Sequence, residues 1–237
     1  IILVSTFVIF NDVQILDTRI DILDKILSTQ ILNFLFVSFC ILIVINGSNF
    51  IDGLNTLTVG YYILIGIIIF LLSFNQAIII KDISINYLIL LLFIFFVLNM
   101  MNKIYLGDAG SYLLGFCFAV FLIDIYNSNQ NISPFFIVLL LWYPCFENLF
   151  SIMRKNTFNN SPMKADKNHF HQLIFFFLKK KYKFKILFCN ILSAQIINFY
   201  NFTIFCIGAK FVSKTDMQVI LILFSVIIYS LIYLKLY

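Results

Sequence analysis

Seven long apolar runs constrain this chain more than any other feature of its sequence. They cover about residues 27–46, 58–74, 85–101, 112–126, 134–153, 185–208 and 217–236. A helix needs about 20 apolar residues to cross a hydrocarbon core of about 30 Å. The runs do not alternate between polar and apolar residues, which favours helices over the strands of a membrane barrel. We therefore predict an all-α, polytopic transmembrane helix bundle with about seven full spans and a partial one at the N-terminus.

The composition supports the same fold class. Of the 237 residues, 62% are hydrophobic and 11% are charged, and the mean hydropathy of +1.01 is well above that of soluble domains. We find no internal repeat and no linker, so we expect one domain over residues 1–237. The five cysteines lack the spacing of a metal site or a disulfide framework, and we interpret them as small core residues.

A polar stretch, Asn46–Leu57, lies between two of the apolar runs. Its Asn49, Asp52 and Asn55 are three residues apart, so on one helix they would step about 60° each and project into one sector. One carboxylate and two amides would then face one point. The alternative is an ordinary polar loop that contains an Asp-Gly pair.

Two further polar stretches follow, Asn102–Ser111 and Arg154–Lys185. Two spans separate each stretch from the one before it, so all three lie on the same side of the membrane. The last stretch holds nine of the sixteen Lys and Arg residues of the chain against one acid, Asp166. The positive-inside rule makes this side cytoplasmic, and it places the acidic stretch Asn11–Lys25 outside.

The second polar stretch contains Leu106-Gly-Asp-Ala-Gly-Ser-Tyr112 at the start of a predicted helix. Gly107 and Gly110 let the backbone approach a ligand closely, and the free amides of a first helical turn can meet phosphate. Asp108 can hold a divalent cation. Mg²⁺ prefers one or two carboxylates completed by phosphate oxygens and waters, which Asp108 and Asp52 on adjacent loops would provide. Zinc is disfavoured, because no cysteine accompanies the histidines.

The third polar stretch contains both histidines of the chain, His169 and His171. Two residues apart, they do not share a helix face, but they can point the same way in an extended turn. Beside Lys164 and Lys167, we interpret them as anion-binding groups.

Two other charged features have plain structural explanations. For Lys179–Lys185 we favour a solvated basic segment that attracts anionic lipid headgroups, with residues 170–185 lying in the membrane interface. Glu147 is an ionisable residue within a span and therefore a functional candidate. The alternative is a structural carboxylate that pairs with Arg154 or Lys155, two turns further on.

Four motifs of the sequence resemble those of a known family. They are Asn46-x-x-Asn49-x-x-Asp52-Gly-x-Asn55, Leu106-Gly-Asp108-x-Gly-Ser111-Tyr-Leu-x-Gly115, Tyr143-Pro-x-Phe-Glu147-x-Leu-Phe-Ser-Ile and His169-x-His171-Gln-Leu-Ile. In this order, over nearly the whole chain, they are similar to the polyprenyl-phosphate hexose-1-phosphate transferases of glycosyltransferase superfamily 4. The His-x-His-Gln form resembles the O-antigen and teichoic-acid branch of that family.

The resemblance implies transfer of an N-acetylhexosamine 1-phosphate from a UDP-sugar to undecaprenyl phosphate, with release of UMP and with Mg²⁺ as cofactor. The reaction would take place at the cytoplasmic face of the bacterial inner membrane and would initiate a cell-envelope polysaccharide such as the O-antigen of lipopolysaccharide. By the match, Asp108 and Asp52 would be the metal ligands, and together with His169 and His171 they would be the catalytic residues. The substrate-binding residues would be Asn49, Asn55, Gly107, Gly110, Ser111, Lys164 and Lys167.

The residues suit such a reaction, because a lipid phosphate and a diphosphate repel each other. A cation and basic groups offset that repulsion. We expect the membrane, the UDP-sugar and the undecaprenyl phosphate lipid as partners and no nucleic acid, with a homodimer as an open alternative to the monomer.

The sequence departs from the family in an important respect. Family members carry an acidic pair in an earlier cytoplasmic loop, whereas the nearest candidate here, Asn11-Asp12, falls on the outer side. We therefore expect an N-terminally truncated transferase that lacks roughly three to four helices of ~20 residues each. Smaller departures are Thr56, where the family usually has Gly, and Lys167, near a usual Asp/Arg pattern.

Two other functions stay open. A catalytically inactive binding or scaffold protein would hold the UDP-sugar or the lipid phosphate through the same loops, and nucleotide binding without turnover would identify it. A transporter would show inverted repeats or half-helices near the midplane, which the sequence lacks.

Overall fold

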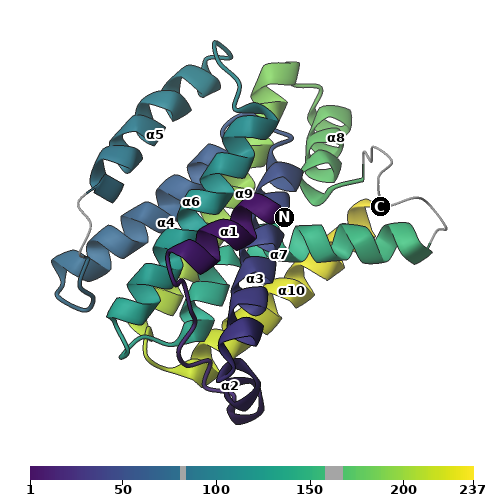
Figure 1. The fold of residues 1–237 in the computed structure, drawn as a ribbon. Helices are drawn as coiled ribbons and strands as arrows, with labels where there is room; N and C mark the ends of the chain where they lie inside the picture. Colours follow the sequence, from purple (N-terminus) through teal and green to yellow (C-terminus); the bar gives the residue numbers. More distant parts are fainter. Residues whose placement is uncertain (81–83, 158–167) are drawn as a thin grey trace.

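The computed structural model describes residues 1–80, 84–157 and 168–237, and within these ranges it consists of helices without a strand (Figure 1). The helices are α1 (Ile2–Phe10), α2 (Asp21–Leu27), α3 (Gln30–Ile51), α4 (Leu57–Phe74), α5 (Ser84–Met100), α6 (Gly107–Ser128), α7 (Pro134–Thr157), α8 (Phe170–Tyr182), α9 (Ile186–Lys210) and α10 (Thr215–Leu236). The predicted all-α class is confirmed.

Six helices in the described part of the chain are long and apolar enough to cross a membrane, namely α3, α4, α6, α7, α9 and α10. The apolar run predicted at about 85–101 is helical as α5 (Ser84–Met100), and its described apolar part, Tyr87–Met100, is shorter than the six full spans. Helix α5 lies at the edge of the bundle beside α4 (Figure 1). There the Ile89 side chain fills the space over Gly66, where a Cβ would lie 2.6 Å from Ile89 Cδ1.

Helix α3 is central to the bundle and packs on both α6 and α7. Glycines permit both approaches. A Cβ at Gly47 would lie 2.3 Å from the backbone oxygen of Pro144 in α7, and a Cβ at Gly115 of α6 would lie 2.9 Å from Ile45 Cα. Small residues let helix backbones come close in a membrane, where dispersion contacts hold helices together. The C-terminal end of α3 therefore has a fixed position relative to α6 and α7.

Hydrogen bonds between side chains and neighbouring helices add to this packing. The Tyr61 hydroxyl of α4 donates to the Leu140 carbonyl of α7 at 2.8 Å, and the Trp142 indole donates to Asn201 Oδ1 of α9 at 2.8 Å. All of these side chains are buried. A polar group left unpaired in an apolar interior is costly, so each bond fixes one helix relative to another.

The loops at one end of the bundle are held together by Arg19. Its guanidinium donates to the Ile132 carbonyl, the Ser213 carbonyl and the Thr215 hydroxyl, each at 2.9 Å. The acidic stretch predicted to lie on the outer side is therefore bonded to the α6–α7 and α9–α10 connections. Part of that stretch is helical, since α2 begins at Asp21.

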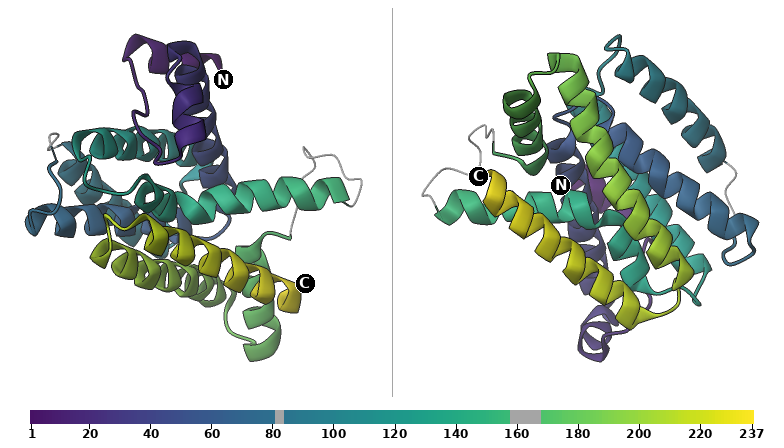
Figure 2. Two further views of the ribbon diagram at one scale, coloured as in Figure 1. Left: turned by 90° about the horizontal axis from the view of Figure 1, so that it is seen from below. Right: turned by 180° about the vertical axis from the view of Figure 1, so that it is seen from behind.

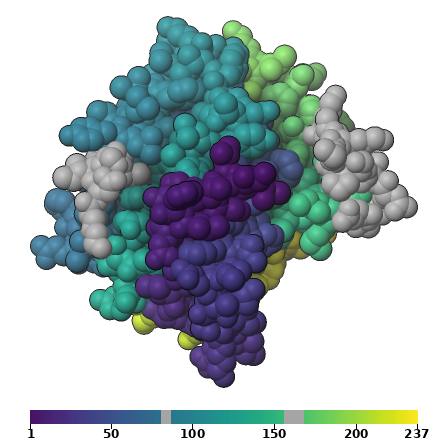
Figure 3. All heavy atoms as spheres, in the orientation of Figure 1, coloured from purple at the N-terminus to yellow at the C-terminus, as the bar shows by residue number. Residues whose placement is uncertain are grey.

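The opposite end of the bundle holds the described parts of the three predicted polar stretches. There the C-terminal end of α3 meets the N-terminal ends of α6 and α8. Helix α1 lies across α3 and α6 on one face of the molecule, and its Phe7 ring packs 4.9 Å from that of Phe116 (Figure 3). The C-terminal part of α7 projects beyond the other helices (Figure 2).

Candidate active site

Two carboxylates stand at neighbouring helix ends, Asp52 at the C-terminus of α3 and Asp108 in the first turn of α6. Asn49, in the last turn of α3, donates from Nδ2 to Asp108 Oδ1 at 2.9 Å and to Ser111 Oγ at 3.2 Å. The Ser111 hydroxyl is buried and donates in turn to the Asp108 carbonyl at 3.0 Å. Asn49 and Ser111 therefore fix the orientation of the exposed Asp108.

The electrostatics of Asp52 reflect this neighbourhood. Burial, and to a smaller extent the nearby Asp108 charge, raise the pKa of Asp52 to about 6, whereas a hydrogen bond from the Gly107 backbone opposes the rise. Two like charges held this close are unfavourable unless a cation or a proton lies between or beside them. The pair can therefore accept a cation.

The expected single helical sector of Asn49, Asp52 and Asn55 is wrong, because α3 ends at Ile51. Asn55 lies in the following turn and is engaged within the protein. Its Nδ2 donates to Asn102 Oδ1 at 2.9 Å, and its backbone N–H donates to Asn190 Oδ1 at 2.7 Å. A substrate-binding role for Asn55 stays a prediction.

Thr56 occupies the turn between α3 and α4 with a φ of +69°, in the left-handed region that favours glycine. The surrounding contacts stabilise this conformation. The Thr56 backbone N–H donates to Asn99 Oδ1 at 2.6 Å, and the Thr56 hydroxyl accepts from Gln195 at 2.9 Å. The backbone here therefore has the conformation that a glycine, the residue expected from the resemblance, would adopt without strain.

The glycines at the start of α6 differ in what they require. Gly107 has a φ of +66°, and a Cβ there would meet nothing within 4 Å, so the backbone conformation rather than crowding calls for glycine. A Cβ at Gly110 would meet only the flexible side chain of Leu106. The open space over Gly107 agrees with the expected close approach of a ligand.

A second group of polar residues surrounds Glu147 of α7, which is buried. Its Oε1 lies 2.9 Å from His169 Nδ1, and its Oε2 accepts a hydrogen bond of 2.6 Å from the Tyr229 hydroxyl of α10. The Phe170 backbone N–H also points at Oε1, at 3.4 Å. A carboxylate only accepts, so His169 Nδ1 carries the proton of this contact.

The partners proposed for Glu147 from sequence, Arg154 or Lys155, are wrong, because the carboxylate is bonded to His169, Phe170 and Tyr229. Arg154 donates to the Asn168 carbonyl and to the Tyr233 hydroxyl. Both are contributed by segments distant in sequence. The Glu147 carboxylate instead joins α7, α8 and α10 at the point where His169 begins α8.

The two histidine rings stack in parallel, with centroids 5.7 Å apart and an interplanar angle of 11°. The rings therefore lie next to each other, but the expected extended turn is wrong for His171, which lies in the first turn of α8, and holds only for His169. His171 is fully buried, and neither ring nitrogen has a hydrogen-bond partner among the described residues. Burial lowers the pKa of His171 to about 4. The ring is therefore neutral at pH 7 and offers an N–H donor rather than a positive charge.

Gly53 connects the carboxylates to the histidines. A Cβ at Gly53 would lie 2.1 Å from His171 Nε2, so only glycine fits beside this ring. The Phe50 ring lies 5.5 Å from that of His169. The convergence predicted from span counting is therefore confirmed for Asp52, Asp108, His169 and His171. The remaining predicted residues, Lys164 and Lys167, lie outside the described part of the chain.

Within the described residues, no group of three or more His, Cys, Asp and Glu side chains could hold a metal ion. An all-protein cage is thus not formed there. Two carboxylates that leave room for phosphate oxygens and waters are the donor set that Mg²⁺ accepts.

Comparison with known proteins supplies the family. Residues 1–126, more than half of the chain, match the family described as Glycosyl transferase family 4. The chain belongs to glycosyl transferase family 4. The matched part contains Asn49, Asp52, Asp108 and Ser111, whereas Glu147 and the histidines lie beyond it.

One curated relative of this family member comes from Bacillus subtilis (strain 168) and is named probable undecaprenyl-phosphate N-acetylglucosaminyl 1-phosphate transferase. It is 29% identical over 135 residues, which is 56% of this chain and 37% of the relative. The matched part thus spans just over a third of that protein's length. No solved structure matches the chain. Together with the six apolar helices, these matches make the chain a multi-pass membrane protein.

Proposed function

We propose that the complete protein transfers an N-acetylhexosamine 1-phosphate from a UDP-sugar to undecaprenyl phosphate and releases UMP. The observation that carries this proposal is the meeting of Asp52 and Asp108 with His169 and His171 around Gly53. Family membership and the name of the Bacillus subtilis relative support the same reaction.

The reaction links two phosphates through a shared oxygen, and the bonds form and break at one phosphorus atom. An oxygen of the lipid phosphate attacks the sugar-bearing phosphorus of the UDP-sugar, and a new P–O–P linkage forms as the bond to UMP breaks. Fixed donors must meet the charge that shifts onto UMP. The N–H of the neutral His171 ring is one such donor, and the Glu147 contact at Nδ1 holds His169 beside it. The first-turn amides of α6 provide further donors for phosphate.

Asp52 and Asp108 are the residues that would hold Mg²⁺. The Asp108 charge adds to the effect of burial on the pKa of Asp52, and a bound cation would relieve the repulsion between the two carboxylates. When bound, the ion would neutralise phosphate charge and act as a Lewis acid. Asn49 keeps Asp108 oriented for this role through its 2.9 Å hydrogen bond.

The lipid substrate requires an apolar path beside the site. A groove of about 360 Å³ runs along α3 and α7 and is lined by apolar residues such as Val44, Cys145 and Leu149. Leu149 lies two residues after Glu147 on α7. We assign this groove to the polyisoprenoid tail. The basic residues of α8 at the same end of the bundle favour a cytoplasmic active site at the bacterial inner membrane.

The test is Asp108→Asn in the full-length protein, with Mg²⁺-dependent UMP release as the readout. We expect UMP release to be lost while membrane insertion is kept. Asp124→Asn is the matched control, since Asp124 lies near the other end of the same helix. Wild-type turnover in Asp108→Asn would remove Asp108 from its role, and nucleotide binding without turnover in the native protein would favour a binding protein instead.

A further inference from the structure

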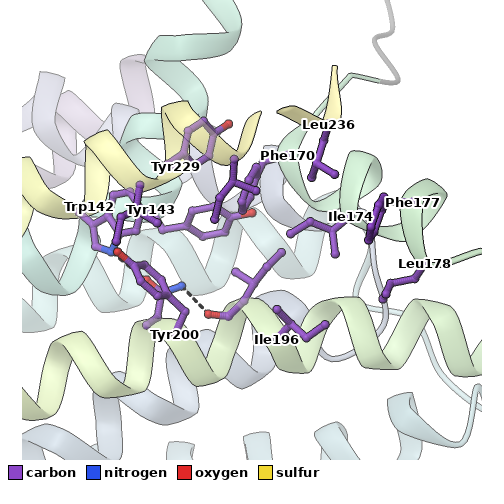
Figure 4. Close-up of a pocket in the computed structure, with 14 residues that line it drawn as sticks. Trp142, Tyr143, Phe170, Ile174, Phe177, Leu178, Ile196, Tyr200, Tyr229 and Leu236 are labelled. Carbon is purple, nitrogen blue, oxygen red and sulfur yellow. Dashed lines mark hydrogen bonds between the residues drawn. The ribbon is translucent and has the colours of Figure 1, made fainter. Parts of the chain in front are cut away.

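An apolar cavity of about 320 Å³ lies between α7, α8, α9 and α10 (Figure 4). Buried aromatic residues, Trp142 and Tyr143, form its deepest part, and the exposed residues Phe177, Ile196 and Ile232 form its rim. The cavity is therefore a slot that opens on the surface of the bundle. Such a slot in a membrane protein faces the acyl chains of the bilayer.

Helix α8 forms one wall of the cavity and is amphipathic. Its Phe170, Ile174 and Leu178 are buried at four-residue intervals, and all three line the cavity. Lys179, Lys180 and Lys181 follow directly and are exposed. An amphipathic helix with lysines beside its apolar face is typical of a segment that lies in the headgroup region of a membrane.

One lysine stands at the mouth of the cavity. The Lys181 ammonium lies 5.3 Å from the centroid of the Phe177 ring, which belongs to the rim. Lys183 and Lys185 are also exposed, and the sequence contains no Asp or Glu between Asp166 and Asp216. The charged side chains that this stretch of the sequence places near the mouth are thus all positive, and they complement a negatively charged headgroup.

We infer that this cavity binds an acyl chain of an anionic phospholipid, whose headgroup is held by the lysines at the end of α8. The undecaprenyl phosphate substrate is a poorer occupant, because the cavity is closed toward the candidate active site. The Phe170 and Tyr229 rings, with centroids 4.4 Å apart, stand between the cavity and Glu147. The bound lipid fixes α8 against α9 and α10, and α8 carries His171. The inference does not depend on the proposed transfer reaction.

The test uses Trp142, which lines the cavity and is the one tryptophan of the sequence. The protein is placed in phosphatidylcholine vesicles that contain either phosphatidylglycerol or phosphatidylcholine brominated in the acyl chain, at equal mole fraction. Bromine quenches indole fluorescence on contact. Trp142 is only 3% exposed, so bulk lipid does not reach it, and quenching reports a chain inside the cavity. We expect brominated phosphatidylglycerol to quench Trp142 more than brominated phosphatidylcholine does.

Variants separate the headgroup from the chain. Combined Lys179→Gln, Lys180→Gln and Lys181→Gln should weaken the apparent affinity for phosphatidylglycerol by about fivefold per lysine. Lys210→Gln with Lys214→Gln, at the opposite end of α9, is the matched control and should leave quenching unchanged. Ile196→Phe fills the slot from its rim and should reduce quenching by both lipids.

Three results would overturn the inference. One is equal quenching of the native protein by the two brominated lipids. Another is full phosphatidylglycerol preference in the lysine variant, with its helix content intact by circular dichroism. The third is displacement of brominated phosphatidylglycerol by unlabelled undecaprenyl phosphate at lower mole fraction than by unlabelled phosphatidylglycerol, which would assign the cavity to the substrate lipid.

Discussion

Replacement of Glu147 by Gln tests whether the buried carboxylate positions His169. Gln has the same shape, so its amide oxygen can accept from His169 Nδ1 and from the Phe170 backbone, and its NH₂ group can donate to Tyr229. The hydrogen bonds are retained and the negative charge is lost. A hydrogen bond to a charged group contributes about 1.5–3 kcal/mol and a neutral one about 0.5–1.5 kcal/mol, so the loss of charge removes about 1–1.5 kcal/mol and we expect turnover to fall by about 5- to 13-fold.

The assay is UMP release by the full-length protein in detergent, with kcat and KM determined separately and the thermal midpoint Tm measured on the same samples. Glu147→Ala is the contrasting variant. It leaves the His169 N–H and the Tyr229 hydroxyl without an acceptor, at about 1–3 kcal/mol for each, and should lower Tm strongly. Tyr229→Phe removes one donor and keeps the carboxylate, so its turnover should exceed that of Glu147→Gln. Native turnover in Glu147→Gln, at native Tm, would refute the positioning role.

Three further changes follow from close contacts and burial. Gly53→Ala places a methyl group 2.1 Å from His171 Nε2, so the ring must shift, and turnover should fall about 10- to 100-fold. Turnover equal to that of the native protein would contradict this contact. Gly47→Leu forces α3 away from the Pro144 backbone and should cost about 1–3 kcal/mol of unfolding free energy, visible as a lower Tm in detergent. The pKa of His171 is lowered from its ordinary 6.5 to about 4, so the unfolded chain binds a proton that the folded chain excludes, and stability falls as the pH drops from about 6.5 toward 4. His171→Asn should remove about 3 kcal/mol of this pH dependence. Unfolding is followed across that range in the native protein and in the variant. The raised pKa of Asp52 changes stability with pH in the opposite direction to His171, but it does so in both proteins and cancels in the difference between them.

The bundle itself could be predicted from the sequence, because the physics of a membrane leaves few choices. A run of about 20 apolar residues must be a helix, and the number of spans between two loops decides whether they share a side. That reasoning brought Asp52, Asp108 and His169 together from three separate stretches. It also located α5, predicted at about 85–101 and observed at Ser84–Met100.

The end of α3 could not be predicted from residue spacing. The three-residue interval of Asn49, Asp52 and Asn55 fits a continuous helix, but Asn55 and Thr56 are bonded to Asn99 and to α9, far along the chain. Those tertiary hydrogen bonds hold the turn open. The relevant signal was Thr56, which stands where the resembled family has glycine and adopts the left-handed backbone that glycine favours.

The partners of Glu147 illustrate the same limit. Sequence proximity favoured Arg154, two turns away on the same helix, whereas the structure pairs Glu147 with Tyr229, 82 residues away. The family match ends at residue 126, before Glu147 and both histidines, yet Gly53 inside the match contacts His171 beyond it. The part of the chain inside the family match and the part beyond it therefore both contribute to the site. A carboxylate pair alone would repel a diphosphate, and a neutral buried His171 alone has no charge with which to attract one. Where Gly53 brings them together, a cation held by the carboxylates would supply the attraction for the phosphates, and the His171 N–H would supply a fixed donor.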